Sequence, residues 1–298
     1  AEMKHVAVIG GGISGLSALH TLKRKLGPSH ELRLIDAHKV GGWLETASRK
    51  YGGAQGGGVH RFEKGPRSMR AAEKGQASLV LISQLPSLAS RLVSSSEASS
   101  TRLLYLNGQV TPLPSSLFGL FQSPVTRKFI PNGIKNFFAN HKPTDDDESI
   151  ASFFERHMGK DFTRNILAGV VVGIYGGSID KLSVNACFPS IARIGRDYGS
   201  LVRGFLLKPA TEGISKRILE DLACTEEERR AYEQLSARIA KAGTGVFTFK
   251  DGIDEFPKAL ADLHDRNIMG GAVEEIYDAG DDGDLVYYIE GAEGPMWG

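Results

Sequence analysis

The stretch His5-Val-Ala-Val-Ile-Gly-Gly-Gly-Ile-Ser-Gly15 decides the fold of this chain. Its first five residues, His5 to Ile9, form a short β-branched run of the kind that is buried in a parallel sheet. The run leads directly into Gly10 to Gly15, which contains the spacing Gly-x-Gly-x-x-Gly. A helical pattern follows, with leucines three and four residues apart until Gly27, where a left-handed cap is expected. This order of strand, turn and helix predicts a dinucleotide-binding unit.

The second strand of this unit is expected at Leu32 to Asp36, and it ends in a carboxylate. The glycines let the backbone approach a pyrophosphate, and the helix N-terminus offers its unpaired N–H groups to the phosphates. Asp36 can accept hydrogen bonds from ribose hydroxyls. The alternative is a tight turn without a ligand, but both strands, the helix and the acid occur at the required separations. We therefore predict an α/β, Rossmann-like fold.

Length, composition and charge limit the class of protein. The chain has 298 residues, of which 41% are hydrophobic and 24% charged, so it is typical of globular rather than disordered or fibrous proteins. Its net charge of +1 provides no overall field that would attract nucleic acid. Cys187 and Cys224 lie far apart and indicate neither a disulfide framework nor a zinc site. No apolar run is long enough to span a bilayer, and with the first strand so early we expect no cleavable leader within this sequence.

Two motifs follow the acid. Val40-Gly-Gly-Trp43 contains a second glycine pair, which resembles the extended motif of the flavin amine oxidase superfamily, where this loop closes over FAD. In the second motif, Arg61-Phe-Glu-Lys-Gly-Pro-Arg67, glycine and proline predict a rigid turn that presents Arg67. A guanidinium near the flavin pyrimidine would stabilise the negative charge of the reduced ring. The alternative for Arg67 is a solvated arginine on a surface turn.

The order of motifs along the chain resembles the protoporphyrinogen oxidases, and the fungal-type eukaryotic members most closely. The resemblance is carried by Gly41-Gly-Trp43, Glu63 to Arg67, Arg102-Leu-Leu-Tyr105 and Gly173-Ile-Tyr-Gly-Gly177. It implies a fold of the two-dinucleotide-binding-domain type, with discontinuous domains and a mainly helical membrane-binding subdomain. The implied activity is the FAD-dependent oxidation of protoporphyrinogen IX to protoporphyrin IX in haem biosynthesis, in three two-electron steps with O2 as acceptor.

The resemblance also assigns roles to residues at matching positions. It implies that FAD is bound by Gly10, Gly11, Gly12, Ile13, Ser14, Gly15, Asp36, Ala37, Trp43, Gly65, Pro66, Arg67, Ser68 and Val273. Arg102 is expected to face a propionate of the substrate, because a guanidinium matches a carboxylate in bidentate geometry. Its alternative is a charge at a strand end in a β-hairpin that turns at Asn107-Gly108. Gly173 is expected to lie against a pyrrole ring; alternatively it is one more glycine of a glycine-rich helix end. No general base and no metal ligand are assigned.

The domain order is expected to be discontinuous. Residues 1–100 form the first part of the FAD-binding domain, 101–210 a helical region for substrate and membrane, 211–243 an exposed, charged helical insertion, and 244–298 the return to the FAD-binding domain. Residues 101–144 contain phenylalanines and basic side chains but no Asp or Glu, which suits a monotopic membrane surface. An ordinary loop-rich subdomain with a phenylalanine core is the alternative. The family resemblance implies a peripheral location on the mitochondrial inner membrane and is compatible with a homodimer.

Two alternatives to this function remain open. Another enzyme of the superfamily, such as a carotenoid desaturase or an amine oxidase, would share the cofactor motifs, but a carotene would not need the cationic Arg102. The family's further C-terminal portion, with a second FAD contact, has no counterpart after Trp297. The chain is therefore expected to be a fragment or a truncated form, and a non-catalytic fragment that binds a membrane or a partner is the second alternative.

Overall fold

A computed structural model of the chain describes residues 3–53, 56–71, 75–95, 103–106, 108–112, 127–142, 147–207, 216–243, 245–278, 285–289 and 296–297. The chain divides into two compact units. Unit 1 comprises residues 1–100 and 213–298, and unit 2 comprises residues 101–212. The finer division into four segments stays a prediction.

Unit 1 contains most of the strands. Its strands are β1 (Lys4–Ile9), β2 (His30–Asp36), β3 (Thr46–Gly53), β4 (Gly56–Glu63), β5 (Met69–Arg70), β6 (Leu92–Ser94), β9 (Val246–Phe249), β10 (Ile268–Gly270), β11 (Val273–Asp278), β12 (Leu285–Ile289) and β13 (Met296–Trp297). Its α-helices are α1 (Ile13–Leu26), α2 (Gln76–Ser83), α3 (Pro86–Ser90), α12 (Lys216–Asp221), α13 (Glu226–Lys241) and α14 (Glu255–Leu263), with 3-10 turns at Gly27–Ser29 and Asp265–Asn267. The predicted α/β, Rossmann-like class is confirmed, with the first two strands and the helix between them close to the expected positions.

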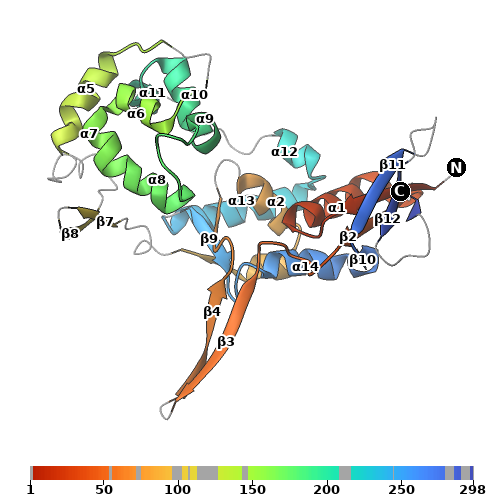
Figure 1. Cartoon of the computed structure of the whole chain (residues 1–298). Coiled ribbons are helices and arrows are strands. Elements are labelled where there is room, and N and C mark those ends of the chain that lie inside the picture. The colour runs from red at the N-terminus through yellow and green to blue at the C-terminus, as the bar shows by residue number, and fades with distance from the viewer. Residues whose placement is uncertain are drawn as a thin grey trace. The chain divides into compact units, whose positions relative to one another are not determined.

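A three-stranded parallel sheet organises unit 1, in the order β1-β2-β10 (Figure 1). Leu32 and Leu34 of β2 point to one face of this sheet and pack with apolar side chains of α1, α2 and α14. Ile35 points to the other face and packs with Met269 and Val273. This alternation is what a strand with a buried sheet face on each side requires. β10, which pairs in parallel with the end of β2, has no counterpart among the predicted strands.

The core of unit 1 corrects one expectation. The segment 211–243 is predicted to be an exposed insertion, but α13 packs against α2 and contributes Tyr232, Leu235 and Ile239 to the main hydrophobic core. The helix begins with the predicted capping box, in which the Thr225 hydroxyl and the Glu228 carboxylate each bond the other's backbone N–H. Opposite its charged face, α13 carries a narrow apolar stripe at helical spacing, and this stripe is buried. The expectation of an exposed insertion is therefore wrong for this helix.

Three further sheets complete unit 1. β3 and β4 form a long antiparallel ribbon that extends away from the rest of the unit (orange in Figure 1). β9 is the central strand of an antiparallel sheet in the order β5-β9-β6, and β11, β12 and β13 form another. The strands predicted at 246–249, 272–277 and 285–290 are therefore present with small shifts.

Unit 2 is mainly helical. Its helices are α5 (Ile130–Phe138), α6 (Ile150–Met158), α7 (Lys160–Phe162), α8 (Ala168–Tyr175), α9 (Val184–Cys187), α10 (Pro189–Tyr198) and α11 (Leu201–Leu207), with a 3-10 turn at Arg127–Phe129 and a π-helical segment at Thr163–Leu167. The predicted hairpin is present as β7 (Leu103–Leu106) and β8 (Gln109–Pro112), in antiparallel register. The helices enclose a separate core around Ile150, Phe153 and Val171. Across the described parts of both units, no helix is long and apolar enough to cross a bilayer.

Candidate functional site

The glycine-rich turn lies at the carboxyl end of the parallel sheet. The Gly10 N–H donates to the carbonyl oxygen of Ile35 (N···O 2.7 Å), which ties the end of β1 to the end of β2. Gly10 has a φ of +100°, a conformation that favours glycine. α1 then begins at Ile13, so the N–H groups of its first turn face outward from the sheet edge. This edge is where parallel α/β sheets bind ligands.

Each glycine of the turn meets different surroundings. A Cβ at Gly15 would lie 1.9 Å from the Gly10 carbonyl oxygen, so Gly15 is required for α1 to lie close to the turn. A Cβ at Gly11 would lie 2.8 Å from Oδ2 of Asp36. In contrast, a Cβ at Gly12 would meet no protein atom within 4 Å. The space beside Gly12 is therefore open to a ligand, as a phosphate-binding turn requires.

Asp36 is held by the turn that it faces. Its Oδ2 accepts a hydrogen bond from the Gly11 N–H, and its Oδ1 accepts one from the His38 N–H (2.8 Å). Because each carboxylate oxygen can accept more than one hydrogen bond, both retain capacity for ribose hydroxyls. Ala37, the next residue, is exposed at the same edge. These positions agree with the predicted ribose-binding role.

A second loop closes on the first. The Gly41 N–H donates to the Gly11 carbonyl oxygen (2.8 Å), and a Cβ at Gly42 would lie 3.2 Å from the Cα of Gly12. Gly41 and Gly42 have φ values of +120° and +57°, so this close approach depends on both glycines. Trp43 follows with 83% of its surface exposed.

The loop at residues 64–68 packs against the second loop. The Lys64 N–H donates to the Glu45 carbonyl oxygen (2.9 Å), and a Cβ at Gly65 would lie 2.1 Å from the Trp43 carbonyl oxygen. The Lys64 ammonium also bonds the Glu45 carboxylate (2.8 Å) and thereby lowers the pKa of that group. Three loops that are separate in sequence thus form one continuous backbone surface. The exposed residues after Gly65 on this surface are Pro66, Arg67 and Ser68.

Val273 reaches the site from the far end of the chain. The Gly271 N–H donates to the Asp36 carbonyl oxygen (3.0 Å), and the half-buried Val273 packs on Ile35. The predicted cofactor residues from Gly10 to Val273 therefore lie around one sheet edge. Glu63 belongs to one of the sequence motifs but has no predicted role; it accepts hydrogen bonds from the Thr46 hydroxyl (2.7 Å) and the Ile253 N–H (3.1 Å) and so anchors the chain just before Gly65. No local pattern marks such a residue, because its partners are distant in sequence.

The structure does not place the predicted substrate residues, Arg102 and Gly173, at the candidate cofactor surface. Arg102 lies outside the described residues. Gly173 is exposed near the end of α8, and a Cβ there would meet no atom within 4 Å, so the helix itself does not require glycine. Val172 and Ile174 beside it are also exposed, at 57% and 63%. This part of unit 2 presents an apolar surface with a side-chain-free position.

The chemistry available at the sheet edge is that of binding. Backbone N–H groups and the positive end of α1 suit phosphates, and Asp36 suits hydroxyl groups. Among the described residues, no group of three His, Cys, Asp or Glu side chains is arranged to hold a metal ion. The arrangement fits a dinucleotide, which would itself have to supply any redox chemistry.

Comparisons with known proteins agree with this geometry. Residues 8–85 match the model of the NAD(P)-binding Rossmann-like domain. The chain is 29% identical to the protoporphyrinogen oxidase of Schizosaccharomyces pombe, over 86% of this chain and 53% of that protein. It is 29% identical to the coproporphyrinogen III oxidase of Bacillus subtilis, over 85% of this chain and 51% of that protein. The chain thus spans about half the length of these curated relatives.

A solved structure shows the same fold. It is assigned provisionally as a protoporphyrinogen oxidase from Exiguobacterium sp. 255-15. It superposes with a TM-score of 0.63 at 18% identity, over 99% of this chain and 57% of that one.

Proposed function

We propose that this chain is a member of the flavin amine oxidase superfamily, that it binds FAD, and that it serves the oxidation of protoporphyrinogen IX to protoporphyrin IX with O2 as acceptor, as its similarity to protoporphyrinogen oxidases supports. One observation carries the cofactor proposal. The loops at Gly10–Gly15, Gly41–Trp43 and Gly65 pack into one surface beside Asp36, with an open space at Gly12. A nicotinamide-type βαβ unit needs only the first of these loops, whereas the second glycine pair is expected to close over FAD.

The chain's own residues would bind and orient the cofactor. The N–H groups at the start of α1 would bind the pyrophosphate, Asp36 the ribose, and Val273 would contact the adenine end. Arg67 would lie toward the flavin pyrimidine, where a guanidinium stabilises negative charge. The bound flavin would supply the capacity to accept a hydride from the porphyrinogen.

The substrate is the finer part of the proposal. Porphyrinogens carry propionate groups, and Arg102 is the cation that we expect to bind one of them. Gly173, on its exposed apolar helix end, leaves room for a flat ring. Because one relative is named a coproporphyrinogen III oxidase, coproporphyrinogen III is the second candidate substrate. Turnover assays with both porphyrinogens distinguish the two.

A peripheral membrane location is also proposed. It is supported by exposed apolar side chains of unit 2, including Ile134 and Phe138 on α5, and by Lys128 and Lys135 nearby in sequence. The proposed mitochondrial inner membrane and a homodimer rest on the family resemblance alone.

Gly12→Val tests the cofactor proposal. Because the Cβ position of Gly12 is open and its φ of −69° suits any residue, the variant should fold normally but lose FAD, since the valine fills the space of the pyrophosphate. The measurement is the flavin content of the purified protein after gel filtration, together with its CD spectrum. Gly52→Val is the matched control, because a Cβ at Gly52 in β3 also meets no atom within 4 Å. Equal flavin content in the wild type and in Gly12→Val would contradict the assignment.

A further inference from the structure

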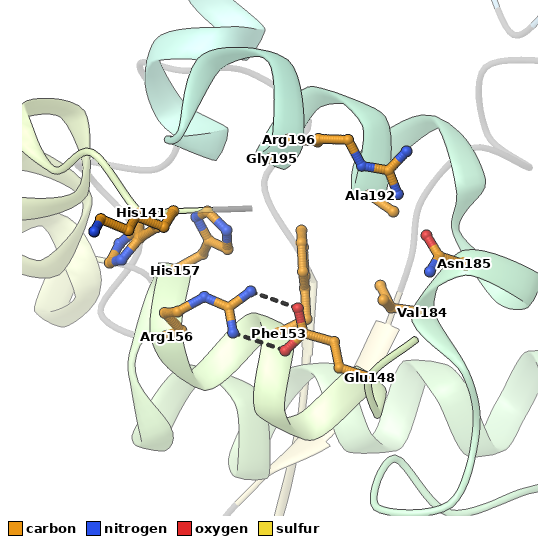
Figure 2. Close-up of a pocket in the computed structure, with 11 residues that line it drawn as sticks. His141, Glu148, Phe153, Arg156, His157, Val184, Asn185, Ala192, Gly195 and Arg196 are labelled. Carbon is orange, nitrogen blue, oxygen red and sulfur yellow. Dashed lines mark hydrogen bonds and ion pairs between the residues drawn. The ribbon is translucent and has the colours of Figure 1, made fainter. Parts of the chain in front are cut away.

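Unit 2 contains a polar cavity that the proposed reaction does not use (Figure 2). Helices α6, α9 and α10 and the residues around His141 and Glu148 form its walls. Its free space is about 20 Å³, room for one water molecule or one small polar group, and it opens to solvent. The lining residues are His141, Lys142, Glu148, Phe153, Arg156, His157, Val184, Asn185, Ala192, Gly195 and Arg196.

Arg156 has an unused hydrogen-bond donor at this cavity. Its two terminal nitrogens bind the two carboxylate oxygens of Glu148, with 2.7 Å between Nη1 and Oε2 (Figure 2). This end-on geometry leaves Nε, which is buried and has no hydrogen-bond partner in the part of the chain that the structure describes. A buried donor without an acceptor has lost its hydrogen bonds to water without a replacement, so an acceptor at this position would stabilise the unit. The side of a guanidinium that carries Nε is also a common binding edge for carboxylates and phosphates.

His157 presents a second donor to the cavity. The Asn136 carbonyl oxygen accepts from the Ser200 hydroxyl (3.0 Å) and the Val202 N–H (3.1 Å), so its amide nitrogen faces Nδ1 of His157 (3.3 Å) as a donor. Nδ1 therefore accepts, and the proton of the neutral ring is on Nε2. This atom lies on the wall at Gly195, where a Cβ would approach it to 3.2 Å.

The charges around the cavity favour an anion. Among the described residues that line it, Lys142, Arg156 and Arg196 are cationic, and Glu148 is the only carboxylate. Neither Lys142 nor Arg196 has an ion-pair partner within the described part of the chain. Asp147, next to Glu148, is engaged by the Asn185 amide (2.9 Å).

The two histidines remain neutral in this environment. Burial, His141 and Arg156 lower the pKa of His157 to about 4, and burial and Arg156 lower that of His141. Counted over the described residues that line it, the cavity therefore has an excess of positive charge and of hydrogen-bond donors over acceptors.

We propose that this cavity binds a small anion, a carboxylate or a phosphate group, which accepts hydrogen bonds from Nε of Arg156 and from His157 and pairs with Arg196. A water molecule would satisfy one donor but would leave the excess positive charge. An anionic group accepts the hydrogen bonds and also balances the excess positive charge. The cavity admits one such group, and Lys142 and Arg196 would contact the rest of the ligand. Because the cavity lies wholly within unit 2, the proposal does not depend on FAD binding or on the oxidase activity.

The test titrates the full chain with sodium phosphate, sodium acetate or sodium chloride at constant ionic strength. Binding is followed by NMR, through the Nε–H signal of Arg156 and the ring signals of His141 and His157. We expect a saturable downfield shift of the Nε–H signal with phosphate or acetate, and which of the two binds more tightly identifies the anionic group. Arg196→Gln should weaken binding about tenfold or more, because it removes a charge-assisted contact. Arg193→Gln, which removes an exposed arginine from the same helix, is the matched control and should not change the affinity.

Two further variants keep the test decisive. Arg156→Lys retains the charge beside Glu148 but removes the Nε donor, so the histidine signals should no longer respond to the anion. The double variant D145N/D146N tests whether neighbouring carboxylates of this chain are the ligand, and we expect it to bind external anions as the wild type does. The proposal is overturned by shifts that do not saturate, by equal effects of Arg193→Gln and Arg196→Gln, or by an increase in affinity of about tenfold in D145N/D146N.

Discussion

Gly12 and Gly15 belong to the same short motif, but the structure gives them different roles. Gly15 is required by the protein itself, since a Cβ would overlap the Gly10 carbonyl oxygen. Gly12 is required only if a ligand occupies the open space beside it. The spacing of the motif is compatible with both roles. Only the surroundings of each Cβ position distinguish a glycine that the fold requires from a glycine that a ligand would require.

At the residue scale, His20 of α1, Gln84 and His264 form a buried hydrogen-bonded series. The Gln84 amide donates to the Leu222 carbonyl oxygen (2.9 Å), so its own oxygen accepts from Nε2 of His20 (3.0 Å). Nδ1 of His20 must then accept from Nε2 of His264 (2.9 Å), which leaves Nδ1 of His264 buried without a partner. This series of hydrogen bonds thus requires both histidine rings to be neutral.

The hydrogen bonds among His20, Gln84 and His264 predict that acid destabilises unit 1. Burial, His20 and Lys23 lower the pKa of His264 to about 4 from 6.5, so between these pH values the unfolded state binds more protons than the folded state. The contribution of the neutral His264 ring to the free energy of unfolding is complete above about pH 6.5. It is lost as the pH falls toward 4, by up to about 1.4 kcal/mol per pH unit. The measurement is urea unfolding at pH 7.5 and 5.0. His264→Gln should reduce the difference in the free energy of unfolding between pH 7.5 and pH 5.0. His38→Gln, at an exposed site, should leave that difference unchanged. An equal pH dependence in wild type and His264→Gln would contradict this account.

At the scale of single elements, α13 shows how a charged helix can be part of a core. Acidic residues occupy its first turn and basic residues its last turn, which complements the helix dipole. Arg24 of α1 bonds the Glu228 carboxylate (2.7 Å), and Arg238 bonds the Leu92 carbonyl oxygen (3.1 Å). The polar face therefore also links α13 to its neighbours.

Ile239→Ala tests whether α13 is integral to unit 1. Ile239 is fully buried, so the substitution should lower the free energy of unfolding by about 2 to 5 kcal/mol, through lost apolar contact and the cavity that remains. Lys241→Ala, two residues later and exposed, should change it by less than about 0.5 kcal/mol. Urea denaturation measures both values. A small effect of Ile239→Ala would restore the prediction of a peripheral insertion.

At the scale of the whole molecule, each unit has its own hydrophobic core. The main core of unit 1 combines residues from both ends of the chain, around Leu16 and Phe256, whereas the core of unit 2 is drawn from residues 150–201. Unit 2 is therefore inserted into unit 1 in sequence but has a hydrophobic core made from its own residues. Such an insertion can carry a separate surface function.

The proposed membrane location predicts binding to lipid vesicles through unit 2. Ile134 and Phe138 lie four residues apart on α5, so they share one face of the helix, and they are 57% and 78% exposed. I134S/F138S should lower binding to vesicles with an anionic phospholipid by about tenfold or more, because apolar side chains drive interfacial insertion. V59S/I276S removes two exposed apolar side chains from unit 1 and is the matched control. Co-sedimentation with vesicles measures both, and equal binding by the two variants would exclude α5 as the contact.

Some features of this protein follow from the sequence alone. The first strand, the glycine turn, helix α1, the β7–β8 hairpin and the capping box of α13 were all predictable, because each depends on residues within a few positions of one another. The local conformation of the candidate site's first turn, Gly10 to Gly15, was predictable for the same reason. A local backbone conformation needs only the right residues at the right spacing, and these are visible in the printed chain.

Other features were decided by tertiary structure. β10 pairs with β2, and Val273 packs on Ile35, although more than 200 residues separate the partners. Likewise, no sequence pattern shows that α13 is buried or that Nε of Arg156 lacks an acceptor. Burial and hydrogen-bond satisfaction depend on which distant segments share a core, and that is determined by the packing of the whole chain rather than by any local spacing.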